Sequence, residues 1–569
     1  MKGRIMLRKN VLKLCGTSDI NGYTAETAPV VMPINTPGYS AQSALTEYIS
    51  VSDYMSNGFI YAHAGCRGRD AGAPTGVTDL KAAVRYLRYN SQVIAGDMES
   101  IFTFGMSGGG AQSALMGSTG DSELYDTYLT EIGAVQGVSD AVCGSMCWCP
   151  ITNLDTADEA YEWMMGTTRS GLSDEEQQIS DKLAEAFADY INSAGIKDES
   201  GNALKLEASS DGIYQAGSYY DYMKSVIEES LENFLVDTEF PYDASASSGG
   251  GMGGDPGGGG MPDGEMQGGE FGGGKPDEST DSGFDGGKPD GNMDGGFDGG
   301  KPDGDMPDGN KPDGAPDDNN GGHGNKHGQG HGNAAENNND SKTSDGEVSY
   351  EDIDDITRND TTSGLSLSGT YETAQDYIDA MNENEEWVKY DSSTGKVTIT
   401  SIEAFVKAFK IASKNIGAFD QLDGGQGENT LFGYGDGKGA HFDATLAEIL
   451  ESMGSDYATD YADDLKKIDS AGNTVEVRLD MYTPLYYLLE SEEGYGKSSV
   501  AKYWRIRTGI AQGDCALSTE MNLALSLENY NGVESVDFET IWGAGHTQAE
   551  RTGDSTSNFI EWVNECMAK

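Results

Sequence analysis

The 569-residue sequence predicts an α/β fold, in which a mostly parallel sheet with helices on both faces is interrupted by a large helical cap insertion. Two observations predict it. Buried-strand patterns alternate with amphipathic helix patterns from residue 28 to about 151 and again from residue 502 onward, and strands joined by helical crossovers run parallel. The long stretch between these segments is mainly helical, which is typical of a cap inserted into a sheet domain.

The two sheet segments contain the expected strands and helices in sequence. The first helix has Leu80, Val84 and Leu87 on one face. The N-terminal elements are the strands at 28–34 and 58–65, the helix at 76–90, the strand at 99–107, a helix that starts at 108–117 and the strand at 141–151. The C-terminal elements are the strand at 502–510, the helix at 517–530, the strand at 536–543 and the helix at 557–568.

The central stretch is expected to be the cap. Its first helix, at 173–195, opens with Ser173 and Glu176 in capping-box spacing. Two further amphipathic helices are expected at 218–235 and 401–415, and a β-hairpin at 387–400. The predicted domain boundaries are 1–155 and 496–569 for the two parts of the sheet domain, and 156–495 for the cap.

Residues 245–346 form a low-complexity tract of Gly, Asp, Pro, Asn and Met. Such a composition buries too little apolar area to offset backbone entropy, so a disordered linker is expected. The alternatives are a loose Ca²⁺ site on its carboxylates and a transition-metal site on its histidines, but neither set has the fixed spacing of a metal-binding loop. A KPD unit recurs at Lys275, Lys288, Lys301 and Lys311, and the histidines are His323, His327 and His331.

The net charge of −58 argues against two classes of partner. Nucleic-acid affinity comes mainly from Lys and Arg that neutralise phosphates, and an anionic membrane surface repels an acidic chain. No window of 18 apolar residues is present, so no membrane span is expected. The basic N-terminus, residues 1–20, lacks the continuous apolar core of a signal peptide.

The seven cysteines give no disulfide framework, because their number is odd and they are scattered. Cys143, Cys147 and Cys149 have a C-x3-C-x-C spacing that metal ligation could use. Their segment has a buried-strand pattern, however, and no second ligand pair follows it. We therefore interpret these thiols as small buried hydrophobic side chains and expect no metal.

Residues 103–117, TFGMSGGGAQSALMG, contain the pattern Gly105-x-Ser107-x-Gly109. In a chain with 79 glycines the pattern alone is weak, but here an expected strand precedes it and an expected helix follows. The glycines flank a turn at which a side chain would clash, and the helix N-terminus directs N–H groups toward charge that develops beside the serine. Ser107 is therefore the expected nucleophile.

A serine nucleophile needs a base, and His546 is expected to supply it. Three of the six histidines lie in the low-complexity tract, His63 lies in a strand that precedes the serine, and His441 lies in the cap. His546 follows the last strand, between Gly543 and Gly545, where this topology places the base.

Asp514 is expected to be the acid that orients the imidazole. It is the only carboxylate before Glu520 in the loop that follows the penultimate strand, and Asp155 is the alternative. The oxyanion hole is expected to combine the N–H of Gly108 with one from Gly38 or Tyr39, although the latter loop is equally read as a simple Pro-Gly turn.

With these parts in place, the sequence resembles the bacterial tannase-like esterases (subtype B) of the α/β-hydrolase superfamily. The resemblance implies the α/β-hydrolase fold, cleavage of gallic-acid or related aromatic esters by Ser107, His546 and Asp514, and a secreted or cell-surface location. The matching stretches span, with the helical cap, most of the chain outside 245–346; they are INGYTAETAPVV, DLKAAVRYLRYN, GMSGGGAQSALMG, CPITNLDTADEAYEW and WGAGHTQAER.

The resemblance also implies a binding site for the galloyl hydroxyls. In tannases of this kind, a lysine and a glutamate from the cap, with an aspartate beside the triad acid, hold these hydroxyls. The segment 413–433 resembles the matching cap segment and points to Lys414 and Glu428. Adjacent phenolic hydroxyls need an acceptor and a cation close together. The alternative is that both residues are ordinary surface charges.

Two features depart from the family. Where an aspartate pair spaced D-x-D is expected, this chain has Gln512-Gly513-Asp514, so the spacing leaves open whether Asp514 is the triad acid or the substrate-binding acid. The strand at 28–34 resembles the third strand of the usual sheet, and too little chain precedes it for the first two. A truncated product or a misplaced start would explain this, and would also remove a secretion signal.

The sequence therefore predicts a serine carboxylic-ester hydrolase that needs no metal or organic cofactor, and the resemblance implies a small aromatic ester as its substrate. Feruloyl esters and short acyl esters stay open as substrates. The rivals from other classes are a serine peptidase of the same fold and a surface-displayed binding protein whose acidic Gly-rich tract is the working part.

Overall fold

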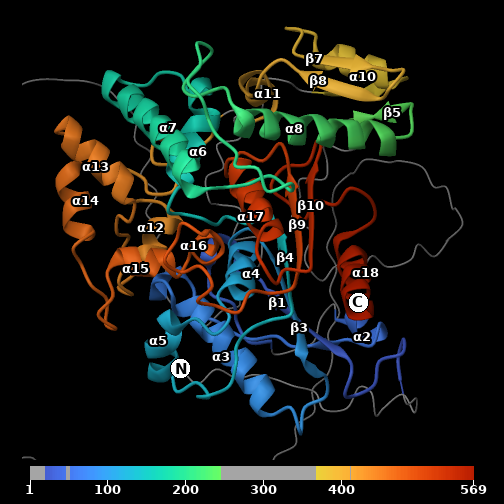
Figure 1. Ribbon diagram of the computed structural model, residues 1–569, viewed down its shortest axis with the longest axis vertical. Coiled ribbons are helices and arrows are strands. Elements are labelled where there is room, and N and C mark those ends of the chain that lie inside the picture. Colours follow the sequence, from blue (N-terminus) through green and yellow to red (C-terminus); the bar gives the residue numbers. More distant parts are fainter. Residues whose placement is uncertain (1–18, 46–50, 245–366, 411) are drawn as a thin grey trace, which may run out of the picture. The chain divides into compact units, whose positions relative to one another are not determined.

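The computed structural model describes residues 19–45, 51–244, 367–410 and 412–569 (Figure 1). All of them belong to one of two compact units of the chain, Met1–Gly260 with Thr357–Lys569. The other unit, Met261–Ile356, lies outside the described residues, and so does the predicted disordered tract at 245–346 with its three histidines.

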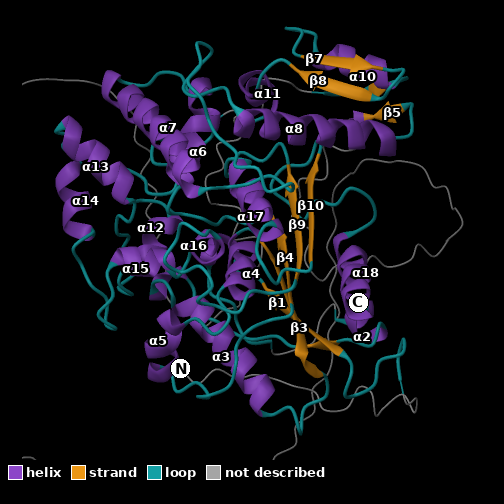
Figure 2. Ribbon diagram, in the orientation of Figure 1, coloured by secondary structure: helices purple, strands orange, loops and turns teal. Residues whose placement is uncertain are grey.

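The main sheet of the described unit has six strands in the order β10-β9-β4-β3-β1-β2 (Figure 2). Every neighbouring pair runs parallel, which confirms the predicted α/β class. The strands are β1 (Pro29–Ile34), β2 (Ile60–Tyr61), β3 (Asp97–Met106), β4 (Gly144–Trp148), β9 (Tyr503–Gly509) and β10 (Ser535–Ile541).

Strands from the two ends of the chain meet in the middle of this sheet. β4 pairs with β9 in register from Gly144 opposite Tyr503 to Trp148 opposite Arg507. Figure 1 shows the cyan β4 beside the red β9. The carboxyl ends of strands from both segments therefore lie along one edge of the sheet, where loops distant in the chain come together.

Helices cover both faces of the sheet, and alternate residues of a strand pack on opposite faces. Val30, Met32 and Ile34 of β1 belong to the core cluster that includes residues of α3, α4 and α17, whereas Val31 belongs to the cluster that includes residues of α2 and α18. Figure 2 shows α4 and α17 on one side of the strands and α18 on the other. The bounds are α2 (Ser52–Ser56), α3 (Thr75–Tyr89), α4 (Gly108–Ser118), α5 (Asp126–Glu131), α17 (Ser518–Glu528) and α18 (Ser555–Ala568).

A buried ion cluster ties α3 to the segment that leads into β4. Lys81 Nζ lies 2.7 Å from Asp140 Oδ1, and Arg85 Nε lies 2.7 Å from Asp140 Oδ2. The side chains of Lys81 and Asp140 are 0% and 1% exposed. Each charge is therefore satisfied inside the protein, and removal of one partner would leave the others buried without compensation.

The stretch between β4 and β9 is mainly helical, and Ser173 and Glu176 form the predicted capping box. No helix in the described parts of the chain combines the length and apolar character that a bilayer span requires. The helices are α6 (Ala157–Met165), α7 (Asp174–Ala194), α8 (Ser218–Asp237), α10 (Ala374–Met381), α11 (Ile402–Phe409), α12 (Gly427–Phe432), α13 (Ala444–Met453), α14 (Ala458–Asp464), α15 (Val475–Asp480) and α16 (Pro484–Leu488). The same stretch contains two antiparallel strand pairs. They are β5 (Tyr242–Asp243) with β6 (Thr370–Tyr371), and the predicted hairpin of β7 (Val388–Asp391) with β8 (Lys396–Ile399).

Two expected elements are shorter than the sequence pattern predicts. The helix expected at 401–415 ends at Phe409, because the backbone N–H groups of Ser413 and Lys414 donate to the Tyr161 hydroxyl and no longer serve a helix. The strand expected at 58–65 is reduced to β2, and further along the chain Cys66 pairs its backbone with Gln42.

Candidate active site

Ser107 lies at the turn between β3 and α4, with φ 58° and ψ −126°. Its N–H donates to Trp148 O at 3.0 Å, and its carbonyl accepts from Ala111 N at 2.9 Å. A positive φ in a residue other than glycine costs roughly 1–3 kcal/mol and persists only where the surrounding structure imposes it. The predicted strand, sharp turn and helix around the serine are therefore present.

The glycines on either side of this turn are required by close packing. A Cβ on Gly105 would lie 2.4 Å from Gly109 O, and a Cβ on Gly109 would lie 2.1 Å from Ile34 O. Real Cβ atoms do not approach so closely, so any side chain would force β3, α4 and β1 apart. The Gly-x-Ser-x-Gly pattern is thus explained by contacts within the fold.

The loop that follows β1 packs directly against the first turn of α4. It contains the short 3-10 helix η1 (Pro37–Tyr39), and a Cβ on Gly108 would lie 2.6 Å from Tyr39 N and 3.3 Å from Gly38 N. The Tyr39 N–H donates to Thr36 O at 2.9 Å. The three predicted oxyanion residues are therefore neighbours, and Tyr39 uses its N–H inside the loop.

His546 lies in the loop after β10, and its imidazole Nδ1 faces the loop after β9. Nδ1 lies 2.7 Å from Gln512 Oε1 and 3.6 Å from Asp514 Oδ2. The first distance is that of a hydrogen bond and the second exceeds one. The His546 side chain is 11% exposed, whereas that of Asp514 is 42% exposed. The predicted acid is thus near the predicted base, but the amide of Gln512 makes the shorter contact.

The His546 loop is anchored to the edge of the sheet on both sides. Ala511 N donates to Ala544 O at 3.0 Å, and the Cys149 thiol lies 3.3 Å from Thr547 O. Further along, the Glu550 carboxylate accepts from the Trp148 indole N–H at 2.9 Å. Because Trp148 O also accepts the N–H of Ser107, the serine and the histidine loops are joined through the end of β4.

The other two described histidines have partners elsewhere. His63 Nε2 lies 2.9 Å from Ser43 O, and burial lowers the pKa of this imidazole. His441 Nδ1 lies 2.7 Å from Asp420 Oδ1, and its ring stacks on Tyr461 at a centroid distance of 3.7 Å. These contacts join both rings to residues outside the predicted site.

Asp155, the alternative acid, belongs to a different group of side chains. Its contacts include the Thr483 hydroxyl and the charge of Glu492, and burial followed by Glu492 raises the pKa of Asp155 to about 7. The described contacts of His546 involve Gln512 and Asp514. Asp514 is therefore the better-placed carboxylate of the two candidates.

Lys414 lies in a segment that is bound to the Asp514 loop. The neighbouring Ser413 hydroxyl donates to Gly513 O at 3.2 Å, and so does the Tyr161 hydroxyl. The Lys414 ammonium lies 3.8 Å from the centre of the Phe419 ring, a cation–π contact. The segment that carries Lys414 is thus attached to the loop beside the predicted base, which distinguishes Lys414 from an ordinary surface charge.

Glu428 lies at the other side of the site, in the first turn of α12. It is 8% exposed, and α12 packs against η1 and the 3-10 helix η2 (Arg69–Ala71). Burial, followed by the Glu428 carboxylate, raises the pKa of Tyr39. The Glu428 charge therefore acts on the loop that carries the predicted oxyanion residues, and its burial excludes an ordinary surface role.

The sequence analysis did not single out the buried carboxylate of Glu520, which lies behind Gln512. The Gln512 side-chain N–H₂ donates to Glu520 Oε1 at 2.6 Å, and Glu520 is fully buried in α17. A glutamate as the only charged residue of the stretch LSTEMNLALSL is the sequence signal that points to it.

Cys147 and Cys149 are buried free thiols at and just beyond the end of β4. Burial raises the pKa of both, to about 12 and about 11. Among the described residues, no group of three or more His, Cys, Asp or Glu side chains is placed to hold a metal ion.

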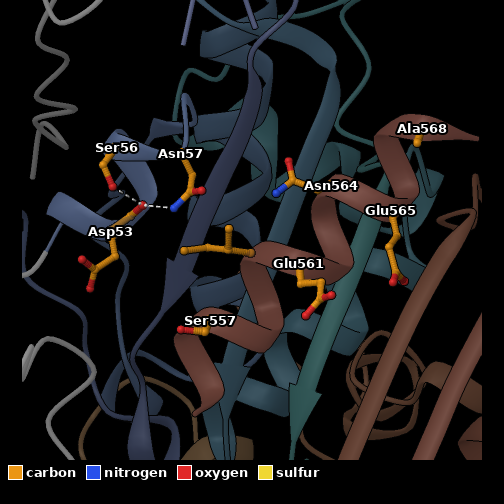
Figure 3. Close-up of a pocket in the computed structure, with 9 residues that line it drawn as sticks. Asp53, Ser56, Asn57, Ser557, Glu561, Asn564, Glu565 and Ala568 are labelled. Carbon is orange, nitrogen blue, oxygen red and sulfur yellow. Dashed lines mark hydrogen bonds between the residues drawn. The ribbon is translucent and has the colours of Figure 1, made fainter. Parts of the chain in front are cut away.

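A separate open pocket lies between α2 and α18 (Figure 3). Asp53, Ser56 and Asn57 line it from α2 and its end, and Glu561 and Glu565 are among the residues that line it from α18. The Ser56 hydroxyl and the Asn57 amide both donate to Asp53 O. The pocket contains none of the predicted site residues and is therefore separate from the candidate active site.

Comparisons with known proteins agree with this architecture. The family described as BD-FAE matches residues 20–191, and no curated protein matches the chain. The structure of a tannin acyl hydrolase from Lactobacillus plantarum superposes with a TM-score of 0.60 at 22% identity, over 98% of this chain and 88% of that one. A tannase from Fusobacterium nucleatum has a TM-score of 0.60 at 23% identity, over 96% and 88% of the two chains.

A third solved structure is a tannin acyl hydrolase in complex with ethyl gallate, with a TM-score of 0.60 at 22% identity, over 99% of this chain and 89% of that chain. The likeness confirms that the chain has the tannase-type α/β-hydrolase fold that its sequence motifs predicted.

Proposed function

We propose that this chain, which has the tannase fold, is a serine carboxylic-ester hydrolase that acts on galloyl or related aromatic-acid esters. The observation that carries the proposal is the position of Ser107, at a strained turn on the sheet edge to which the His546 loop is anchored. A serine held at such a turn is exposed to substrate and has its helix N-terminus behind it.

In the proposed reaction, Ser107 Oγ attacks the ester carbonyl and His546 takes its proton. The carbonyl oxygen of Gln512 can only accept, so the imidazole carries its hydrogen on Nδ1 and has Nε2 as the base. The imidazolium then protonates the departing alcohol, and water releases the acid from the acyl-enzyme by the same steps in reverse. No step requires a metal or an organic cofactor.

The negative oxygen of the tetrahedral intermediate is assigned to the N–H groups of Gly108 and the η1 loop. These groups lie at the first turn of α4, where the helix dipole favours negative charge. Because Tyr39 already donates its N–H to Thr36, Gly38 is the favoured second donor. Gly108 is the residue after the nucleophile and supplies the first.

The aromatic-acid preference rests on three charged groups that lie on, or on segments in contact with, the loops after β1 and β9. Lys414 supplies a cation, while Glu428 and Asp514 supply acceptors, which together suit the adjacent hydroxyls of a galloyl ring. The ethyl gallate and 3,4-dihydroxybenzoate complexes of proteins with this fold support the same class of ligand.

The proposal is tested by turnover of methyl gallate, methyl ferulate, p-nitrophenyl acetate and a peptide reporter, with Ser107→Ala as the control. We expect methyl gallate to have the highest kcat/KM and Ser107→Ala to abolish turnover of every ester. A preference for ferulate or acetate would overturn the galloyl assignment alone, and preferred peptide cleavage would overturn the esterase assignment. Ester turnover that survives Ser107→Ala would overturn the serine mechanism itself.

A further inference from the structure

We propose that Glu520 positions the His546 imidazole through the side-chain amide of Gln512. The buried carboxylate contacts the amide, and the amide contacts the base. The inference rests on the proposed function, in which His546 is the base. It assigns Gln512 and Glu520 as positioning residues, and it assigns Asp514 to substrate.

The side chains form a continuous hydrogen-bonded chain. His546 Nδ1 lies 2.7 Å from Gln512 Oε1, and Gln512 Nε2 lies 2.6 Å from both Glu520 Oε1 and Thr508 Oγ1. The Thr508 hydroxyl in turn donates to Glu520 Oε1 at 3.0 Å, which leaves its oxygen to accept from Gln512. Both amide hydrogens of Gln512 thus have acceptors.

This arrangement fixes the orientation of the amide. A carboxylate accepts and does not donate, so the Gln512 N–H₂ group must face Glu520 and the carbonyl oxygen must face His546. A flipped amide would present N–H to Nδ1 and would move the imidazole hydrogen to Nε2, the atom that must accept the serine proton. Glu520 therefore selects the imidazole tautomer that can act as a base.

Burial makes the arrangement specific. Gln512 is 2% exposed and Glu520 is 0% exposed, so neither side chain exchanges its partners for water. Asp514, by contrast, is 42% exposed and lies 3.6 Å from Nδ1. At 3.6 Å the Asp514 carboxylate is too far from Nδ1 to accept its hydrogen directly, so the tautomer is set by the shorter Gln512 contact.

The hydrogen bonds to Glu520 gather on one oxygen of its carboxyl group, and Oε2 has no hydrogen-bond partner among the described residues. Three donors converge on Oε1, namely Gln512 Nε2, Thr508 Oγ1 and the Cys515 thiol at 3.3 Å. Burial raises the pKa of Glu520, and the charge of the buried Lys410 opposes that rise. A negative charge at this place stabilises the imidazolium through the polarised Gln512 amide.

The test compares Glu520→Gln with the double variant Gln512→Glu/Glu520→Gln, which exchanges the amide and the carboxylate. We expect Glu520→Gln to lower kcat for p-nitrophenyl acetate about 10- to 100-fold with little change in KM. The acid limb of the kcat/KM profile should move down by about one pH unit, because the imidazolium loses a nearby negative charge. The double variant returns a carboxylate to Nδ1 and should recover most of kcat.

Glu528→Gln is the control, since it makes the same carboxyl-to-amide change at the exposed end of the same helix. Unchanged kcat and an unchanged pH profile in Glu520→Gln would overturn the inference, as would a double variant no more active than Glu520→Gln. If Glu520→Gln does not fold, the double variant alone decides. A carboxylate that is needed at 520 only for structure predicts that the double variant is also unfolded and inactive.

A readout without turnover separates this inference from the proposed function. The imidazole ¹⁵N chemical shifts of His546 report its tautomer and its pKa directly. We expect the Nδ1–H tautomer in the unmodified protein and a lower His546 pKa in Glu520→Gln. An Nε2–H tautomer, or a His546 pKa unaffected by the substitution, would overturn the inference even if ester turnover is confirmed. If the expected chemical shifts are observed but no ester is turned over, only the proposed function is overturned.

Discussion

The imidazole Nδ1 of His546 lies 2.7 Å from the amide oxygen of Gln512, and both side chains lie on loops that follow neighbouring parallel strands, β10 and β9. The pairing of these strands brings the two loops to the same edge of the sheet. The contact orders the imidazole through an uncharged group. The stability and activity of the site therefore depend on how tightly the surrounding backbone and buried charges hold these loops.

Replacement of Ser107 by glycine should separate activity from stability. Turnover is lost because the nucleophile is gone. The positive φ at this position is costless for glycine, so the free energy of unfolding should rise by about 1 kcal/mol after the loss of chain entropy is subtracted. Ser107→Ala, which is equally inactive but keeps the strained conformation, is the control. Chemical denaturation measures the difference, and equal stability of the two variants would contradict strain at the turn.

Gly109→Ala should destabilise the protein severely. Its Cβ would lie 2.1 Å from Ile34 O, so the backbone of α4 must move away from β1. We expect a loss of more than about 3 kcal/mol in the free energy of unfolding, measured by denaturant titration. Gly137→Ala is the control for a methyl group that meets no neighbour: nothing lies within 4 Å of its Cβ, and its positive φ of 69° alone should cost only about 1 kcal/mol. Similar losses in both would show that contact with Ile34 is unimportant.

Lys414→Ala and Glu428→Gln should raise KM for methyl gallate far more than KM for p-nitrophenyl acetate. Each removes one charge-assisted hydrogen bond to a phenolic hydroxyl, worth about 1.5–3 kcal/mol, or roughly 10- to 100-fold in KM. Steady-state kinetics on the two esters measures the ratio. Equal effects on both esters would contradict a galloyl-binding role and would favour a general structural effect.

Asp140→Asn should lower the free energy of unfolding at pH 7 by about 3–5 kcal/mol, because Lys81 and Arg85 would stay buried without their carboxylate. Burial acts to raise the pKa of Asp140, but Lys81 and the hydrogen bonds outweigh it and hold that pKa below its usual value. The stabilisation is therefore complete above the unfolded-state pKa of about 3.9 and is lost as the pH falls through the folded-state value.

The pH dependence of this effect gives the measurement. Unfolding titrations of the unmodified protein and Asp140→Asn between pH 7 and pH 3 should show a difference that shrinks as the solution becomes acidic. Asp126→Asn, which lies 3.7 Å from Arg85 and has a side chain 60% exposed, should change stability by less than about 0.5 kcal/mol. A difference for Asp140→Asn that is constant down to pH 3 would contradict the assignment.

The sequence predicted those features that depend on local pattern or on local steric need. Alternation of strands and helices predicted the parallel sheet, and the capping-box spacing of Ser173 and Glu176 predicted the start of α7. The glycines at 105 and 109 predicted the turn at Ser107, because only glycine fits where β3, α4 and β1 meet. Chain order and elimination placed His546 on the loop after the last strand.

The tertiary structure decided which groups surround that histidine. Gln512 and Asp514 lie two residues apart in one loop, and spacing does not distinguish them. Only the folded chain places Gln512 at 2.7 Å and Asp514 at 3.6 Å from His546 and buries Glu520 beside Gln512. The end of α11 was likewise decided by Tyr161, a side chain from another helix that takes the backbone N–H groups of the following segment. Sequence periodicity reflects which residues of a helix or strand face the core. The partner of a side chain on a loop instead depends on packing between segments that lie far apart in the chain.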